Sequence, residues 1–186
     1  MKMPKAVKYG IFLGVLGIIV GILLGLVNHI TKPIIEKAEA QKVVDSLNAV
    51  NNTYTWEESD IDNVYRVGKD SDGNIKMYVF KTNTKGYKSG DLEILTFIYD
   101  DKIVDVVILK MSDQTKGIGT KIAEVSYLKS FVGKDVNDYY NKSSASFNNK
   151  NSVDVISGAT YSSRGLIEAL IIASNNYIDN VKGGNN

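Results

Sequence analysis

The chain has 186 residues, of which 44% are hydrophobic and 23% are charged, with a formal net charge of +1. These proportions are typical of a globular protein, exclude an intrinsically disordered one, and give no reason to expect nucleic acid as a partner. The chain has no cysteine and only one histidine, which excludes disulfides, cysteine-ligated clusters and His–His metal pairs within it. We therefore expect no metal site in this chain.

The first element along the chain is an uncharged, almost wholly apolar run over residues 9–27. About 20 such residues cross a hydrocarbon core of about 30 Å, so the run predicts a transmembrane helix. A cleaved signal peptide is the alternative, but its apolar region is usually about 7–15 residues and ends at a small-residue cleavage site, which residues 28–33 do not offer. Lys2, Lys5 and Lys8 precede the run. The positive-inside rule then predicts a cytoplasmic N-terminus, with everything after the helix on the extracytoplasmic side.

The next stretch, Ile34–Val50, is amphipathic and predicts a helical stalk. Pro33 suits the first turn of a new helix, so we expect a slight break between the transmembrane helix and the stalk. Asn48, Asn51 and Asn52 mark the expected end of the stalk.

Two β-hairpins are predicted after the stalk. The first pairs residues 64–67 with residues 75–80 across a turn at 70–74, and the second pairs residues 92–99 with residues 103–109. The second hairpin is the stronger signal, because it is dense in β-branched residues. Together the hairpins predict an antiparallel sheet.

The remaining segments are predicted by composition and periodicity. Residues 82–90 are expected to form a loop, residues 122–131 a short helix, and the Asn- and Ser-rich residues 136–151 irregular structure. Apolar residues at helical spacing predict a final helix that starts near Gly165 and ends near Asn180.

The ten residues from Asp154 to Ser163 precede this final helix and are small and rich in hydroxyls. A helix N-terminus offers unpaired N–H groups and the positive end of a dipole, so it favours a phosphate. Gly158 would let a ligand approach the backbone, and Ala159 would keep that approach clear. An ordinary helix start is the alternative, because a short side-chain oxygen commonly caps a first turn. The candidate N-caps are Ser157, Thr160, Ser162 and Ser163.

A second small-residue segment, Ser112–Lys121, follows the second hairpin. It contains Thr115, Gly117 and Gly119. The spacing is that of neither a Walker loop nor a Rossmann turn, so on its own it is weak evidence for phosphate binding, and a plain glycine loop is the alternative.

The pattern Asp154-x-x-Ser157-Gly158-Ala159-Thr160 followed by serine resembles the signature of covalently flavinylated FMN-binding domains. Such domains occur in the G subunit of the Rnf ferredoxin:NAD⁺ oxidoreductase and in the C subunit of the sodium-pumping NADH:quinone reductase. In that family the last threonine of the signature carries FMN through a phosphoester bond that a separate flavin transferase makes. The resemblance implies that Thr160 is the attachment residue and that Asp154 belongs to the sequence the transferase recognises.

The segment after the second hairpin adds to this resemblance. The family has a Glu-Thr-Pro-Gly-Leu-Gly loop that packs against the flavin ring, and this chain departs from it at Gln114, Lys116 and Ile118, which replace Glu, Pro and Leu. The cofactor-binding residues that the resemblance implies around Thr160 are Ser157, Gly158, Ala159, Ser162, Ser163, Thr115, Gly117, Ile118 and Gly119.

The resemblance implies an α+β protein with a single transmembrane helix, a stalk and a small antiparallel-sheet FMN-binding domain with flanking helices. Residues 1–30 would form the cytoplasmic N-terminus and anchor, residues 31–52 the stalk, residues 53–182 the extracytoplasmic FMN domain, and residues 183–186 a disordered tail.

The implied function is electron relay through FMN in an Rnf-type membrane complex, between reduced ferredoxin and NAD⁺, coupled to Na⁺ or H⁺ translocation. The implied partners are integral membrane subunits and subunits with iron–sulfur clusters or flavins, and we expect no catalytic residue in this chain. The compact length favours the Rnf subunit over the quinone-reductase subunit, which usually has extra sequence between anchor and flavin domain. A stand-alone flavinylated carrier and a non-redox membrane-anchored binding module are further alternatives.

Overall fold

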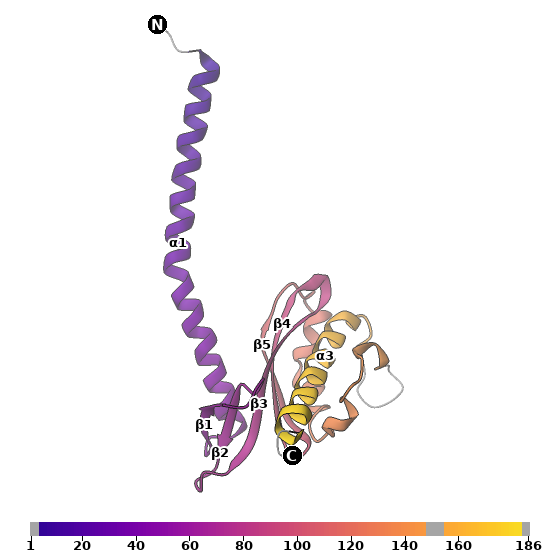
Figure 1. The fold of residues 1–186 in the computed structure, drawn as a ribbon. Coiled ribbons are helices and arrows are strands. Elements are labelled where there is room, and N and C mark those ends of the chain that lie inside the picture. Colours follow the sequence, from indigo (N-terminus) through magenta and orange to yellow (C-terminus); the bar gives the residue numbers. More distant parts are fainter. Residues whose placement is uncertain (1–3, 148–154, 184–186) are drawn as a thin grey trace. The chain divides into compact units, whose positions relative to one another are not determined.

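The computed structural model describes residues 4–147 and 155–183, and the chain divides into two compact units, residues 1–44 and 45–186 (Figure 1). Helix α1, Lys5–Val50, makes up nearly all of the described part of the first unit, and its residues 45–50 are assigned to the second unit. The second unit contains a sheet and the helices that flank it.

Helix α1 is long and apolar enough to cross a membrane. The large apolar side chains from Ile11 to Ile30 are exposed in the structure, as expected of a transmembrane helix whose surface contacts lipid. The predicted break at Pro33 is wrong, because α1 continues through this residue. A proline inside a helix removes one N–H donor, and apolar spanning helices tolerate this when neighbouring groups satisfy the freed backbone.

The sheet has five antiparallel strands, and each one pairs with its neighbour in sequence (Figure 1). Both predicted hairpins are confirmed, and with them the α+β fold. The strands are β1 Thr55–Glu58, β2 Arg66–Lys69, β3 Ile75–Lys85, β4 Asp91–Tyr99 and β5 Lys102–Met111.

Strand β3 is longer than predicted, and the expectation of a loop from residue 82 is wrong. The strand extends to Lys85, and the chain then turns through the short 3₁₀ helix η1, Tyr87–Ser89. Thr82 and Thr84 are buried while their neighbours are exposed, so the segment alternates with the period of a strand. The polar side chains hid this period at the level of composition.

The sheet is followed by short helical turns and then by the main helix of the unit, α3, Thr160–Asn176, which continues as the π-helical segment η5, Tyr177–Lys182. The single short helix predicted over 122–131 is instead divided between a 3₁₀ turn and one turn of α-helix. The short elements are η2 Gly119–Ala123, α2 Val125–Lys129, η3 Val136–Asp138 and η4 Ser144–Ser146.

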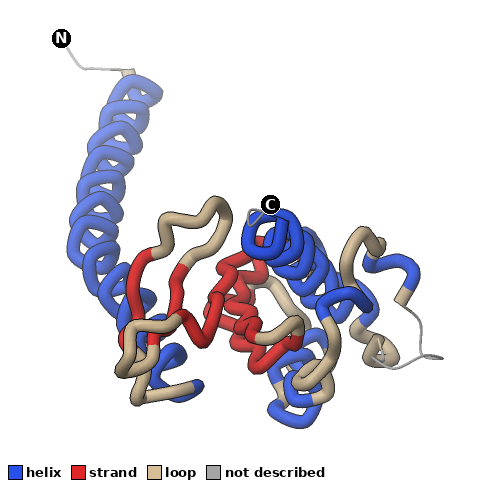
Figure 2. Tube along the Cα trace, turned by 60° about the horizontal axis from the view of Figure 1, so that its bottom comes forward, coloured by secondary structure: helices blue, strands red, loops and turns tan. Residues whose placement is uncertain are grey.

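Helix α3 lies along one face of the sheet and closes the core (Figure 2). Leu166, Ile167 and Leu170 are fully buried against residues of β4 and β5 such as Leu92 and Ile103. This packing fixes the N-terminus of α3 next to the loops that leave β3 and β5.

Candidate functional site

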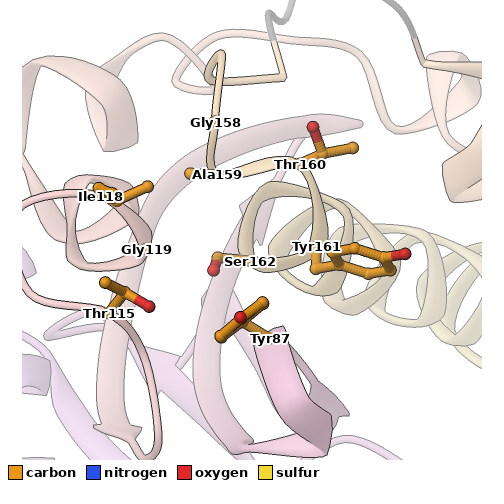
Figure 3. Close-up of a pocket in the computed structure, with 9 residues that line it drawn as sticks. All are labelled: Tyr87, Thr115, Ile118, Gly119, Gly158, Ala159, Thr160, Tyr161 and Ser162. Atoms are coloured by element: carbon orange, nitrogen blue, oxygen red, sulfur yellow. The ribbon is translucent and has the colours of Figure 1, made fainter.

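A pocket of about 390 Å³ lies in the second unit, where three segments of the chain meet (Figure 3). The segments are the turn after β3, the loop after β5, and the N-terminus of α3. Its lining residues are Tyr87, Thr115, Ile118, Gly119, Gly158, Ala159, Thr160, Tyr161 and Ser162. The pocket is within the size range of small-molecule and cofactor sites.

The N-terminus of α3 forms one wall of the pocket, and a glycine makes its geometry possible. Gly158 has φ of +82°, in the left-handed region that side chains disfavour, and it turns the chain into the helix. Ala159 is the N-cap residue, and Thr160 is the first residue of the helix. Thr160 is therefore held at the start of a helix and at the edge of a pocket.

The predicted side-chain caps of this helix are wrong. The cap position belongs to Ala159, which has no side-chain oxygen, and no side-chain hydrogen bond caps this turn among the described residues. Ser162 and Ser163 lie inside the first turn, C-terminal to the cap position, so their hydroxyls do not cap the helix. The Ser163 hydroxyl instead accepts a hydrogen bond from the Ile156 backbone N–H at 3.1 Å, which fixes the preceding turn.

The first-turn amides of α3, those of Thr160, Tyr161 and Ser162, consequently have no acceptor among the residues that the structure describes. Unpaired N–H groups at a helix N-terminus carry partial positive charge and attract an anion. Three of them beside a pocket are suited to a phosphate group.

The loop after β5 forms the second wall. Gly117, with φ of +74°, lets the loop reverse, and its N–H donates to the Thr120 hydroxyl at 2.9 Å. Gly119 lies against α3: a Cβ at this position would come within 2.9 Å of Ser162 Oγ. Only glycine lets the loop approach the helix this closely, so the residue sets the width of the pocket at that point.

Aromatic and aliphatic side chains form the rim. The Tyr87 and Tyr161 rings have centroids 6.4 Å apart with an interplanar angle of 54°. Tyr161 is 68% exposed, Ile118 46% and Tyr87 38%. Large apolar side chains that stay this exposed around one opening are suited to contact a flat apolar ligand.

The structure brings together many of the predicted cofactor residues and leaves others apart. Seven of them line the pocket: Thr115, Ile118, Gly119, Gly158, Ala159, Thr160 and Ser162. Ser157, Gly117 and Ser163 do not line it, although they shape the turns beside it, and Asp154 lies outside the described residues. Sequence reasoning assigned no role in the site to Tyr87 or Tyr161. The position of Tyr161, directly after Thr160 at a helix start, was the available signal for one of them.

Comparison with known families bears on what this pocket holds. The chain matches the FMN-binding domain family over residues 86–175 and the RnfG N-terminal region over residues 1–50. The chain is thus similar to RnfG proteins in its N-terminal region and to FMN-binding domains over residues 86–175. This confirms the resemblance predicted from the Asp154–Ser163 and Ser112–Lys121 motifs. Every residue that lines the pocket falls within the region that matches the FMN-binding domain.

The chain is also similar to a curated protein. The G subunit of the ion-translocating oxidoreductase complex of Methanosarcina acetivorans is 34% identical over 109 residues, which are 58% of this chain and 54% of the relative. The chain thus matches about half the length of that relative.

The pocket fits FMN on physical grounds. The uncapped amides of α3 suit the phosphate, and the rings of Tyr87 and Tyr161 with Ile118 suit the apolar isoalloxazine ring. The lining residues include no carboxylate that would repel the phosphate.

Proposed function

We propose that this chain carries FMN covalently on Thr160 and relays electrons as the G subunit of an Rnf-type membrane complex. The observation that carries the proposal is the position of Thr160, which is the first residue of α3, lines the pocket, and follows a cap position with no side-chain acceptor. An attached phosphate at this residue would lie at the positive end of the helix.

The residues around Thr160 would hold the phosphate. The N–H groups of the first turn would donate to its oxygens, and the helix dipole would stabilise its charge by about 0.3–1 kcal/mol, or up to about 2 kcal/mol in a partly buried site. Gly158 has no Cβ, so the backbone at this turn leaves room for the phosphate.

The rim would hold the ring system. Contacts of the Tyr87 and Tyr161 rings with an aromatic ligand contribute about 0.5–1.5 kcal/mol each beyond their buried area. FMN supplies one- and two-electron transfer when bound. The protein would set its position and exposure, and no lining residue is required as an acid or base.

The proposed partners and location follow from the similarity to RnfG and from the apolar helix α1. A flavin transferase would make the phosphoester bond, with Asp154 in its recognition sequence. Other integral membrane subunits and subunits with iron–sulfur clusters or flavins would exchange electrons with the chain during ferredoxin:NAD⁺ oxidoreduction coupled to Na⁺ or H⁺ translocation.

We place the N-terminus in the cytoplasm and residues 53–182 on the extracytoplasmic side of the membrane, because Lys5 and Lys8 precede the apolar segment. Residues 1–30 would be the anchor and residues 31–52 the stalk. The match to the RnfG N-terminal region favours an Rnf G subunit over a quinone-reductase C subunit or a stand-alone flavinylated carrier.

The test is attachment of FMN in the full-length chain, produced together with its flavin transferase. The wild-type chain is expected to fluoresce as a denatured gel band, with a mass increase of FMN less one water on the peptide that contains Thr160. Thr160→Ala should lose both signals and keep its fold, because the Thr160 hydroxyl does not cap α3 and loss of one hydrogen-bonding group costs about 0.5–1.5 kcal/mol. Thr115→Ala removes a hydroxyl from another pocket wall and should retain the flavin.

Covalent FMN in Thr160→Ala would place the attachment elsewhere. An unmodified wild-type chain, with the transferase shown to be active on another target, would refute the covalent relay and favour a membrane-anchored binding module.

A further inference from the structure

Gln114 lies directly behind the pocket and contacts all three segments that form it. Its Oε1 accepts from the Tyr87 backbone N–H at 3.3 Å and from the Ser162 hydroxyl, and its Nε2 donates to the Ser112 carbonyl oxygen at 2.8 Å. Tyr87 belongs to the turn after β3, Ser112 to the loop after β5 that also contains Gln114, and Ser162 to α3. One amide group thus joins the segments that line the pocket.

The backbone is packed tightly around this amide. A Cβ at Gly86 would lie 2.7 Å from Gln114 Nε2, one at Gly90 2.9 Å from it, and one at Gly119 3.3 Å from Oε1. These three glycines lie in two separate loops, and each lets the backbone approach closer than a side chain would allow. The Gln114 amide therefore has little room to rotate away from its partners.

The partners also fix which way the amide points. The Tyr87 N–H is a donor and needs an acceptor, while the Ser112 carbonyl is an acceptor and needs a donor. Both conditions are met only with Oε1 toward Tyr87 and Nε2 toward Ser112. Ser162 must then donate its hydroxyl hydrogen to Oε1, so in the pocket its oxygen offers only lone pairs.

We propose that Gln114 is a positioning residue of the cofactor pocket, which holds Ser162 as a hydrogen-bond acceptor toward an O–H or N–H donor of the flavin. This rests on the proposed function, since it takes FMN as the ligand. Ser162 lines the pocket two residues after Thr160, on the same first turn of α3 (Figure 3). The ribityl hydroxyls and the ring N–H of FMN are donors of the required kind.

The family that the chain resembles usually has glutamate at this position, and in this chain the amide differs from a glutamate in its contact with Ser112. A glutamate at position 114 would still accept from Tyr87 and Ser162, but its second oxygen would face the Ser112 carbonyl, where two acceptors repel each other. Protonation would restore a donor at that place. Gln114→Glu should therefore reproduce the wild-type arrangement only when the carboxyl is protonated.

This gives a test that does not depend on flavin. In the folded state the pKa of the introduced carboxyl would be raised above that in the unfolded chain, so the stability of the variant would be greatest at low pH and would fall as pH rises above about 4.3. The midpoint of thermal unfolding, followed by Trp56 fluorescence on the full-length chain in detergent, should match wild type near pH 4 and lie about 3–8 °C below it at pH 8. Gln41→Glu makes the same change at an exposed position on α1 and serves as the matched control.

A Gln114→Glu midpoint that follows the Gln41→Glu control at every pH would overturn the proposal. If Gln114→Glu does not fold, Ser162→Ala keeps the Gln114 side chain and removes the hydroxyl, which both donates to Gln114 and provides the acceptor in the pocket. The fluorescence anisotropy of covalent FMN in Ser162→Ala, and in Gln114→Ala, should then fall below that of wild type. Wild-type anisotropy in Ser162→Ala would show that the hydroxyl does not hold the flavin.

The two proposals fail separately. A wild-type chain without covalent FMN contradicts the proposed function, whereas a wild-type chain with FMN and a pH-independent Gln114→Glu variant contradicts only the role of Gln114.

Discussion

At Gly165 the helix α3 packs tightly against the sheet, and replacing this residue with alanine tests whether the tight packing supports the fold. A Cβ at Gly165 would lie 2.5 Å from the Lys85 carbonyl oxygen and 2.8 Å from Leu92 Cδ1. On the same contact, the Thr84 hydroxyl donates to the Gly165 carbonyl oxygen at 2.7 Å. The substitution therefore adds one methyl group where backbone meets backbone.

Two opposing effects determine the size of the change in stability. Alanine is favoured over glycine in a helix interior by about 0.8–1.0 kcal/mol. Against this, the Cβ must retreat by about 0.9 Å to reach ordinary contact distance, since such contacts begin at 3.4 Å. Overpacking of this kind costs about 1–3 kcal/mol, and weakening the Thr84 hydrogen bond costs about 1 kcal/mol more. We expect the free energy of unfolding to fall by about 1–3 kcal/mol.

For a unit of this size the thermal midpoint should fall by roughly 3–10 °C. The single tryptophan reports this transition, because Trp56 in β1 packs edge-on against Phe97 in β4 with ring centroids 6.1 Å apart. Gly183→Ala is the control, since Gly183 is exposed and a Cβ there meets nothing closer than 3.4 Å. A Gly165→Ala midpoint equal to or above that of wild type would show that helix propensity outweighs the contact, and would refute this reasoning.

Two further predictions concern pH. Burial raises the pKa of Tyr177 to about 12, while the unfolded chain titrates near 10, so stability should be lost as pH rises from 10 to 12. Tyr177→Phe should flatten that loss in a series of thermal midpoints, and parallel curves for the two proteins would contradict it. Burial also raises the pKa of Asp105, whose Oδ1 accepts from the Val106 N–H at 2.8 Å. Asp105→Asn keeps an acceptor without the charge, so its midpoint should exceed wild type by about 1–4 °C at pH 7 and equal it near pH 3; a gain that persists at pH 3 would argue against a charge effect.

The strongest parts of the fold could be predicted because their signals are local. The hairpin of β4 and β5 is dense in β-branched residues, and α3 has apolar residues at helical spacing. Strand β1 was missed because Thr55–Glu58 is short and polar, and it is a strand only because β2 pairs with it. The end of β3 was missed for a similar reason. Its threonines are polar, and they are buried because α3 packs on this part of the strand and not because their side chains are hydrophobic.

The pocket shows the same division between local and long-range information. Thr160 and its neighbours form a continuous motif, so the sequence places them together. Tyr87 and Gln114 enter the site from positions far away in sequence, and their approach depends on how the sheet and α3 pack. The cap was predicted wrongly because several hydroxyls compete at this turn, and the positive φ of Gly158 decides which residue begins the helix.

The order of the strands has a consequence in time. Because every strand pairs with its sequence neighbour, all partners of the sheet have been synthesised once Met111 has emerged. The N-terminus of α3, which forms the last wall of the pocket, is synthesised only when Thr160 is added, 49 residues later. At about 5–20 residues per second, translation of that interval takes roughly 2–10 s. Every strand of the sheet is therefore synthesised several seconds before the chain contains the residue to which a flavin could be attached. A chain that terminates in this interval has all five strands, but it lacks both α3, which closes the core, and the proposed attachment residue.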